Sequence, residues 1–130
     1  MPIPLLLTIG LHMAAVLFWL LTSLVLGFGS HAAASTRLFR SQMVAATLAV
    51  FSGGGLWSML HPAGFRGPEM ALAAGAVLAI AAAGVQGALV GANVRRLPDP
   101  AAETQVVRGQ KIAGVLLAVA LACMLLARHV

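Results

Sequence analysis

The sequence predicts an all-α integral membrane protein, an antiparallel four-helix bundle formed by a single domain, residues 1–130. Hydrophobic residues make up 61% and charged residues 8% of the chain, whereas soluble domains are about 45 to 50% apolar and about 25% charged. The mean hydropathy is +1.00. The chain also divides into four apolar segments, each long enough to cross a bilayer, which takes roughly 20 residues.

The first helix is expected over about residues 4–27, between Pro2 and Pro4 at its start and the turn-like GFGS at residues 27–30. A cleaved signal peptide is the alternative, because SHAAAS at residues 30–35 resembles a cleavage site. The segment lacks the basic region that precedes the apolar core of a signal peptide, so we expect a retained helix.

The second helix is expected over about residues 36–60, with Ser35 or Thr36 as its N-cap. It ends before Pro62, because a proline there would clash with the preceding turn.

The third helix is expected over about residues 68–93, where Glu69 complements the positive end of the helix dipole. The fourth is expected over about residues 100–128, with Asp99 as cap and Pro100 in the first turn.

Basic residues predict the orientation, because Lys and Arg accumulate on the cytoplasmic side of membrane proteins. They concentrate in the first and third connections, at Arg37, Arg40, Arg95, Arg96, Arg108 and Lys111. Both termini are therefore expected on the non-cytoplasmic side of a bacterial inner membrane. The net charge of +5 then reflects topology and contact with anionic lipid headgroups. No basic patch interleaved with aromatic residues supports binding of nucleic acid.

Small residues spaced four apart predict close helix packing, because apolar side chains gain little by leaving lipid for one another. The candidates are Gly87 and Gly91 in the third helix and Gly114, Ala118 and Ala122 in the fourth. The same residues also suit contacts with other subunits, in a homo-oligomer or a larger membrane complex.

His12 is the unusual residue of the first helix. Helical periodicity places it on one face with the residues Thr8, Ala15, Trp19 and Ser23. Such a face suits the interior, so we expect His12 to point inward, about 12 Å below the outer surface at ~1.5 Å per residue. An ionisable residue inside a membrane indicates a functional site.

Other candidate ligands fall at the same end of the predicted bundle. His61, His129 and Met59 lie near helix ends, and Trp19 lies two turns from His12 as a possible cofactor neighbour. Imidazole and thioether groups suit haem iron or copper(I). Interfacial histidines and ordinary packing are the alternative interpretation.

Several segments resemble the copper-resistance D and HemJ-type membrane families, which include a haem-containing protoporphyrinogen oxidase. They are LHMAAVLFW at residues 11–19, RLFRSQM at 37–43 and GLWSMLHPAG at 55–64, together with His31. The resemblance implies a haem- or metal-binding role for His12. HemJ-type proteins also carry a histidine in the third helix. Here the chain has Gln86, a poor iron ligand, which we expect to form an interhelical hydrogen bond.

Other chemistries lack their key groups. The three acidic residues, Glu69, Asp99 and Glu103, lie in connections or first turns and not in the apolar interior of a predicted span. Only one cysteine is present, and dinucleotide and P-loop fingerprints are missing from the sequence. Two hypotheses follow. The chain binds haem b or copper through His12, or it is an accessory subunit of a respiratory or photosynthetic complex and binds neither. A homo-oligomeric channel ranks third, because no charged ring provides selectivity.

Overall fold

The computed structural model describes residues 2–29, 34–60, 67–97 and 99–127, and these form helices and turns only. The elements are α1 (Ile3–Phe28), α2 (Ser35–Leu60), α3 (Gly67–Val85), the π-helix η2 (Gln86–Gly91), the short 3₁₀-helix η3 (Val94–Arg96) and α4 (Pro100–Leu126). Four helical segments of the described chain are long and apolar enough to cross a membrane, the third running from Glu69 to Arg96. The predicted all-helical, four-span architecture is confirmed to this extent.

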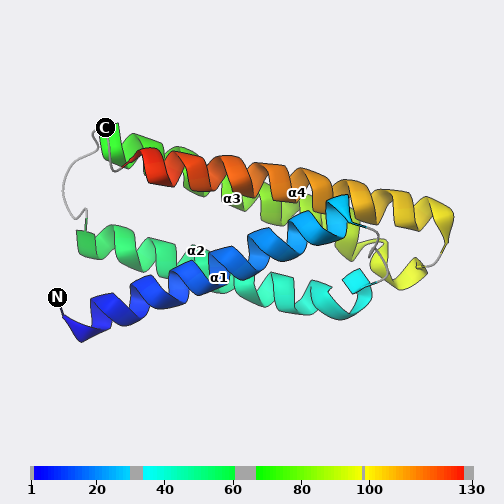
Figure 1. Cartoon of the computed structure of the whole chain (residues 1–130), viewed down its shortest axis with the longest axis horizontal. Coiled ribbons are helices and arrows are strands. Elements are labelled where there is room, and N and C mark those ends of the chain that lie inside the picture. Colours follow the sequence, from blue (N-terminus) through cyan, green and yellow to red (C-terminus); the bar gives the residue numbers. More distant parts are fainter. Residues whose placement is uncertain (1, 30–33, 61–66, 98, 128–130) are drawn as a thin grey trace.

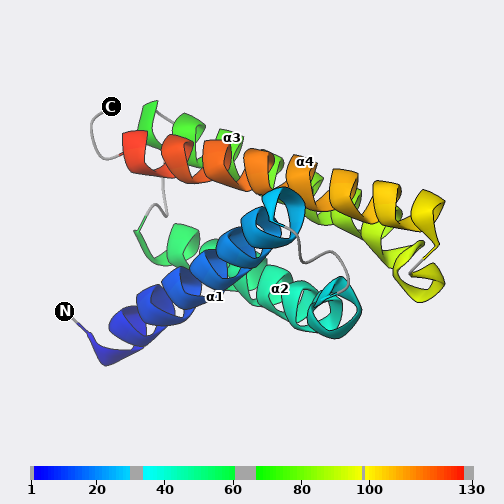
Figure 2. The same cartoon turned by 45° about the vertical axis from the view of Figure 1, so that its right-hand side comes forward.

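Successive long helices run antiparallel, so the start of α1 and the end of α4 lie at one end of the bundle (Figure 1). The end of α1, the start of α2, η3 and the start of α4 lie at the other end, which we call the basic end because the residues Arg37, Arg40, Arg95 and Arg96 lie there. Helix α1 packs against α2 and α4, and α4 also packs against α3. The pairs α1–α2 and α3–α4 spread apart away from the basic end (Figure 2).

Local signals account for the helix ends. The Asp99 carboxylate accepts a hydrogen bond from the backbone N–H of Ala101 at 3.2 Å, and Pro100 occupies the first turn of α4. This confirms the predicted cap. At the end of α1, the N–H of Gly29 donates to the carbonyl of Val25 at 2.8 Å.

The third segment departs from the expected continuous α-helix at Gln86, where it widens into the π-helix η2. Two features accommodate the wider turns. Gly109 brings the α4 backbone against η2, because a Cβ at that position would lie 2.8 Å from Cβ of Leu89. The Asn93 side chain then donates to the Leu89 carbonyl at 2.7 Å and accepts from Arg96 at 2.5 Å. Side chains thus satisfy part of the backbone at this helix end.

The core combines many alanines with leucines, valines and one large ring. Ala82 and Ala113 are fully buried, and Trp19 is 1% exposed. The closest helix approach lies between α1 and α4, where a Cβ on Gly27 would lie 2.6 Å from the backbone nitrogen of Lys111. Such contacts let two backbones meet without intervening side chains.

The small residues expected to pack the bundle divide into two groups. A Cβ at Gly91 would lie 2.9 Å from the Phe39 ring, and one at Gly114 would lie 2.8 Å from Leu24. In contrast, the second group is exposed and comprises Gly87, Ala118 and Ala122. Of the three fourth-helix residues, Gly114 therefore packs against a neighbouring helix of the same chain, whereas the exposed Ala118 and Ala122 do not form a packed stripe with it. For the exposed group, contact with another subunit stays a prediction.

Candidate functional site

The His12 imidazole points across the α1–α2 interface. Its Nδ1 lies 3.0 Å from the backbone carbonyl oxygen of Ala49 and 3.0 Å from Oγ of Ser52. The ring also lies against Gly53, because a Cβ there would come within 3.1 Å of His12 Cε1. The glycine thus makes room for the imidazole beside the α2 backbone. The inward orientation expected for His12 agrees with these contacts.

The neighbours of Nδ1 determine which ring nitrogen carries the proton. A carbonyl oxygen only accepts hydrogen bonds, so Nδ1–H must donate to Ala49. The Ser52 hydroxyl already donates to the carbonyl of Leu48 at 2.5 Å, which leaves its oxygen free to accept. In the neutral ring, Nε2 therefore carries the lone pair. Nε2 forms no hydrogen bond with the part of the chain that the structure describes.

The other predicted ligands do not gather at His12. Met59 lies six residues beyond Gly53 on α2, about 9 Å along the axis at ~1.5 Å per residue, and its side chain is exposed. A copper site formed by His12 and Met59 is therefore not assembled. His61 and His129 lie outside the described residues. Trp19 faces the core, where its indole N–H donates to Gln86 Oε1 at 2.6 Å.

A second polar site lies toward the basic end, in the centre of the bundle. Three fully buried glutamines meet there, Gln42 from α2, Gln86 from η2 and Gln110 from α4. We call the glutamine network these three residues together with their partners Trp19, Thr22, Ser23 and Ser35. It joins all four helical segments through side-chain hydrogen bonds.

Gln110 is the hub of the glutamine network. Its Oε1 accepts from Gln42 at 3.1 Å and from Gln86 at 2.8 Å, while its Nε2 donates to Gln42 at 3.0 Å and to Ser35 at 3.3 Å. Gln86 also donates to Ser23 at 2.9 Å. Every buried side-chain nitrogen and oxygen of the described residues has a partner.

The composition of the glutamine network limits its chemistry. Its members are amides, hydroxyls and one indole, none of which titrates or acts as a nucleophile without activation by a neighbouring base. A fully satisfied polar network in a dry interior instead fixes the relative positions of its helices. We interpret this site as structural, in agreement with the interhelical hydrogen bond expected for Gln86.

Sequence reasoning missed Gln42 and Gln110. Each lies near the start of an apolar span, where an amide resembles an ordinary interfacial residue. The sequence feature that could have identified them is their amide group, because burying an amide in a membrane is costly and favours pairing with another polar group. Spacing along single helices did not show which amides would meet.

Replacing Trp19 with phenylalanine is expected to destabilise the bundle by about 1 to 2 kcal/mol, because Gln86 Oε1 loses the indole donor while most of the ring volume remains. Denaturation in detergent, followed by circular dichroism, measures the change. In a Gln86→Leu background the same substitution should cost less, because no buried acceptor is left unpaired. Equal costs in both backgrounds would show that packing alone explains the effect.

Comparison of the chain with protein-family models, with curated proteins and with solved structures gives no match in any of the three. The resemblance to the copper-resistance D and HemJ-type families therefore stays a prediction.

Proposed function

We propose that the chain is a four-span protein of a bacterial inner membrane that binds haem through His12, with the basic end in the cytoplasm. The four long apolar helices support the insertion. The orientation follows from the basic residues of α2, η3 and α4, because Lys and Arg favour the cytoplasmic side. Both chain ends then face the opposite side.

The proposal rests on the tautomer of the His12 ring and on the hydrogen bonds of its two nitrogens. Histidines that ligate metals usually donate their second ring N–H to a carbonyl or carboxylate, which fixes the tautomer and the direction of the ligating nitrogen. His12 has this arrangement, with Nδ1–H on Ala49 and Nε2 without a hydrogen bond to the described residues. Nε2 of His12 would therefore hold the haem iron, and haem would supply one-electron redox chemistry.

Haem is favoured over copper by the donors near His12. Copper(I) prefers soft thiolate or thioether ligands, and the sulfur of Met59 lies well along α2 from the imidazole. In the described residues, the immediate neighbours of the ring on α2 supply only a carbonyl and a hydroxyl oxygen and a glycine.

The test is a visible spectrum of the purified protein, oxidised and then reduced with dithionite, with metal analysis of the same sample. We expect a Soret band in the wild type and its loss in both His12→Ala and His12→Gln. The glutamine variant retains an amide that can donate to Ala49, so it separates loss of the ligand from loss of the helix contact. Ser52→Ala is the matched control, because Ala49 still accepts from Nδ1 and the spectrum should survive.

A Soret band that persists in His12→Gln would contradict the proposal, and so would a wild type that stays colourless after incubation with haem. If the metal analysis instead finds copper, and the copper is lost when His12 is substituted, the cofactor bound by His12 is copper and not haem.

The second candidate is an accessory subunit without a cofactor. The exposed small residues Gly87, Ala118 and Ala122 favour it, because small residues let a neighbouring helix approach closely. In that case His12 serves only to join α1 to α2. A colourless preparation that copurifies with larger subunits in constant ratio, and a His12→Gln variant as stable as the wild type, would support this function over haem binding.

A further inference from the structure

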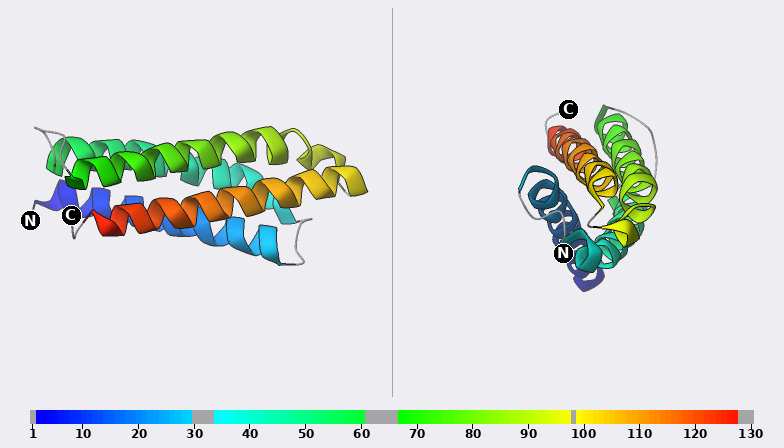
Figure 3. Two further views of the ribbon diagram at one scale, coloured as in Figure 1. Left: turned by 90° about the horizontal axis from the view of Figure 1, so that it is seen from above. Right: turned by 90° about the vertical axis from the view of Figure 1, so that its right-hand side faces the viewer.

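A cavity of about 560 Å³ lies at the basic end, between the first turns of α2 and the η2–η3 segment. Figure 3 shows in its right-hand view that the start of α2 lies beside the yellow η3 segment. Two arginines, Arg40 from α2 and Arg95 from η3, line this cavity. We call it the arginine cavity.

The charges of the arginine cavity are uncompensated within the described residues. Neither Arg40 nor Arg95 forms an ion pair or a hydrogen bond with them, and both side chains are exposed. No acidic residue is among those that line the cavity. Two guanidinium groups facing one space favour a ligand with several acceptor oxygens and negative charge, such as a phosphate.

The rest of the lining is largely apolar. It includes the side chains of Phe39, Met43 and Val94, and Phe39 lies against Gly91. Met43 is eight residues into α2, roughly 12 Å from its start at ~1.5 Å per residue, and the apolar run of α2 begins there. The cavity therefore has cations at headgroup level and apolar side chains at the level where acyl chains begin.

We propose that the arginine cavity binds one anionic phospholipid, with its phosphodiester between Arg40 and Arg95 and an acyl chain along Phe39 and Met43. Basic pockets between membrane helices on the cytoplasmic side suit anionic headgroups in this way. The inference rests on membrane insertion with the basic end in the cytoplasm, but it is independent of haem binding at His12.

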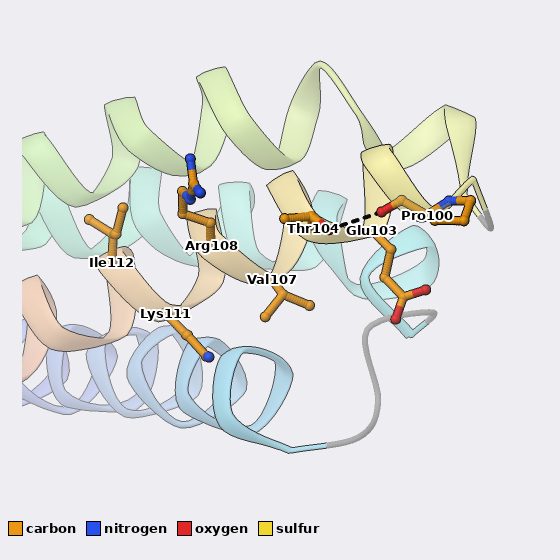
Figure 4. A pocket seen from close by; sticks show the side chains of 7 residues that line it. All are labelled: Pro100, Glu103, Thr104, Val107, Arg108, Lys111 and Ile112. Carbon is orange, nitrogen blue, oxygen red and sulfur yellow. Dashed lines mark hydrogen bonds between the residues drawn. The ribbon is translucent and has the colours of Figure 1, made fainter.

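A second basic hollow, of about 590 Å³, lacks the arrangement of charges that makes the arginine cavity suitable for an anionic ligand. All of its lining residues come from α4 (Figure 4). In Figure 4 the two side chains diverge, Arg108 toward the third helical segment and Lys111 toward the end of α1, and Lys111 Nζ lies 5.6 Å from the centre of the Phe28 ring. Glu103 adds a negative charge to the same surface. The two cations therefore do not face one ligand.

Nanodiscs that contain phosphatidylglycerol and phosphatidylcholine provide the test, with native mass spectrometry of the released protein to count retained lipids. We expect the wild type to retain one phosphatidylglycerol in preference to phosphatidylcholine. In Arg40→Gln/Arg95→Gln, affinity for phosphatidylglycerol should fall at least roughly 20- to 30-fold, since each arginine loses a direct charge-assisted contact with the phosphodiester that contributes about fivefold or more. Arg37→Gln/Arg108→Gln is the matched control, because it removes the same charge from the same end and should change affinity less than about threefold.

Three results would overturn the proposal. Equal losses in the two double variants would indicate general attraction to the surface. No preference for phosphatidylglycerol in the wild type would exclude an anionic lipid site. Release of the lipid by millimolar inorganic phosphate, with no contribution from acyl chain length, would indicate a site for a soluble anion. A wild type that retains phosphatidylglycerol but shows no haem spectrum would leave this inference standing while the function proposed for His12 fails.

Discussion

Replacing Gly27 with alanine is expected to destabilise the bundle by about 3 kcal/mol, near the upper end of the usual cost of overpacking. A Cβ there would lie 2.6 Å from the backbone nitrogen and 2.8 Å from Cα of Lys111, and 2.9 Å from the carbonyl carbon of Gln110. Backbone atoms cannot rotate out of the way as a side chain can. The whole of α4 would have to move away from α1, and contacts along both helices would loosen.

Two matched glycine variants make this prediction specific. Gly10 lies on the same helix, and a Cβ at that position would meet no other atom within 4 Å. Gly10→Ala should therefore leave stability unchanged or raise it by about 0.5 to 1 kcal/mol through helix propensity. At Gly114 the nearest atom is Cδ2 of Leu24, the far end of a flexible side chain, so Gly114→Ala should cost less than Gly27→Ala.

The midpoint of denaturation by sodium dodecyl sulfate, measured by circular dichroism in mixed micelles, ranks these variants. The expected order of stability is Gly10→Ala, then Gly114→Ala, then Gly27→Ala. A Gly27→Ala protein as stable as Gly10→Ala would show that α1 and α4 do not approach as closely as the structure indicates.

Much of the fold could be predicted from the sequence because local signals determine it. Hydropathy located the four spans, and Asp99 with Pro100 marked the start of α4, since capping depends on neighbouring residues only. The period of 3.6 residues also placed Ala15, Trp19 and Ser23 on one face, and all three are buried.

The contacts between helices could not be predicted in the same way. Spacing within one helix identifies a face, but the crossing angles determine what that face meets. The stripe of Ala118 and Ala122 has the same spacing as a packed stripe, yet both residues are exposed. Gly27 resembled part of a turn in the sequence, whereas it lies inside the tightest contact between α1 and α4.

The candidate site was predictable to a similar degree. The cost of an ionisable group in an apolar span identified His12 as a candidate from its position in the sequence. Its contacts with Ala49 and Ser52, and the place that Gly53 leaves for the ring, depend on how α1 crosses α2. The widening at Gln86 was not predictable either, because it is coupled to Gly109 on a different helix.

The second large expected effect concerns the glutamine network. Gln110→Leu should lower the free energy of unfolding by about 2 to 3 kcal/mol. Four hydrogen bonds to Gln42, Gln86 and Ser35 disappear, and interhelical hydrogen bonds in membrane proteins average about 0.6 kcal/mol each. A second estimate gives a similar figure. Among the described residues Gln42 Oε1 accepts from Gln110 alone, and leaving a buried acceptor unpaired costs about 1 to 3 kcal/mol.

A double variant and a control variant distinguish a coupled network from a set of independent contacts. Gln42→Leu/Gln110→Leu should cost clearly less than the two single variants together, because removing both amides leaves neither one unpaired. Gln105→Leu on the same helix lies outside the network and should change stability by less than about 0.5 kcal/mol. Additive costs for the double variant would mean that the glutamines act separately. A small cost for Gln110→Leu, no larger than that of Gln105→Leu, would mean that packing of the alanine-rich core alone holds the four helices together.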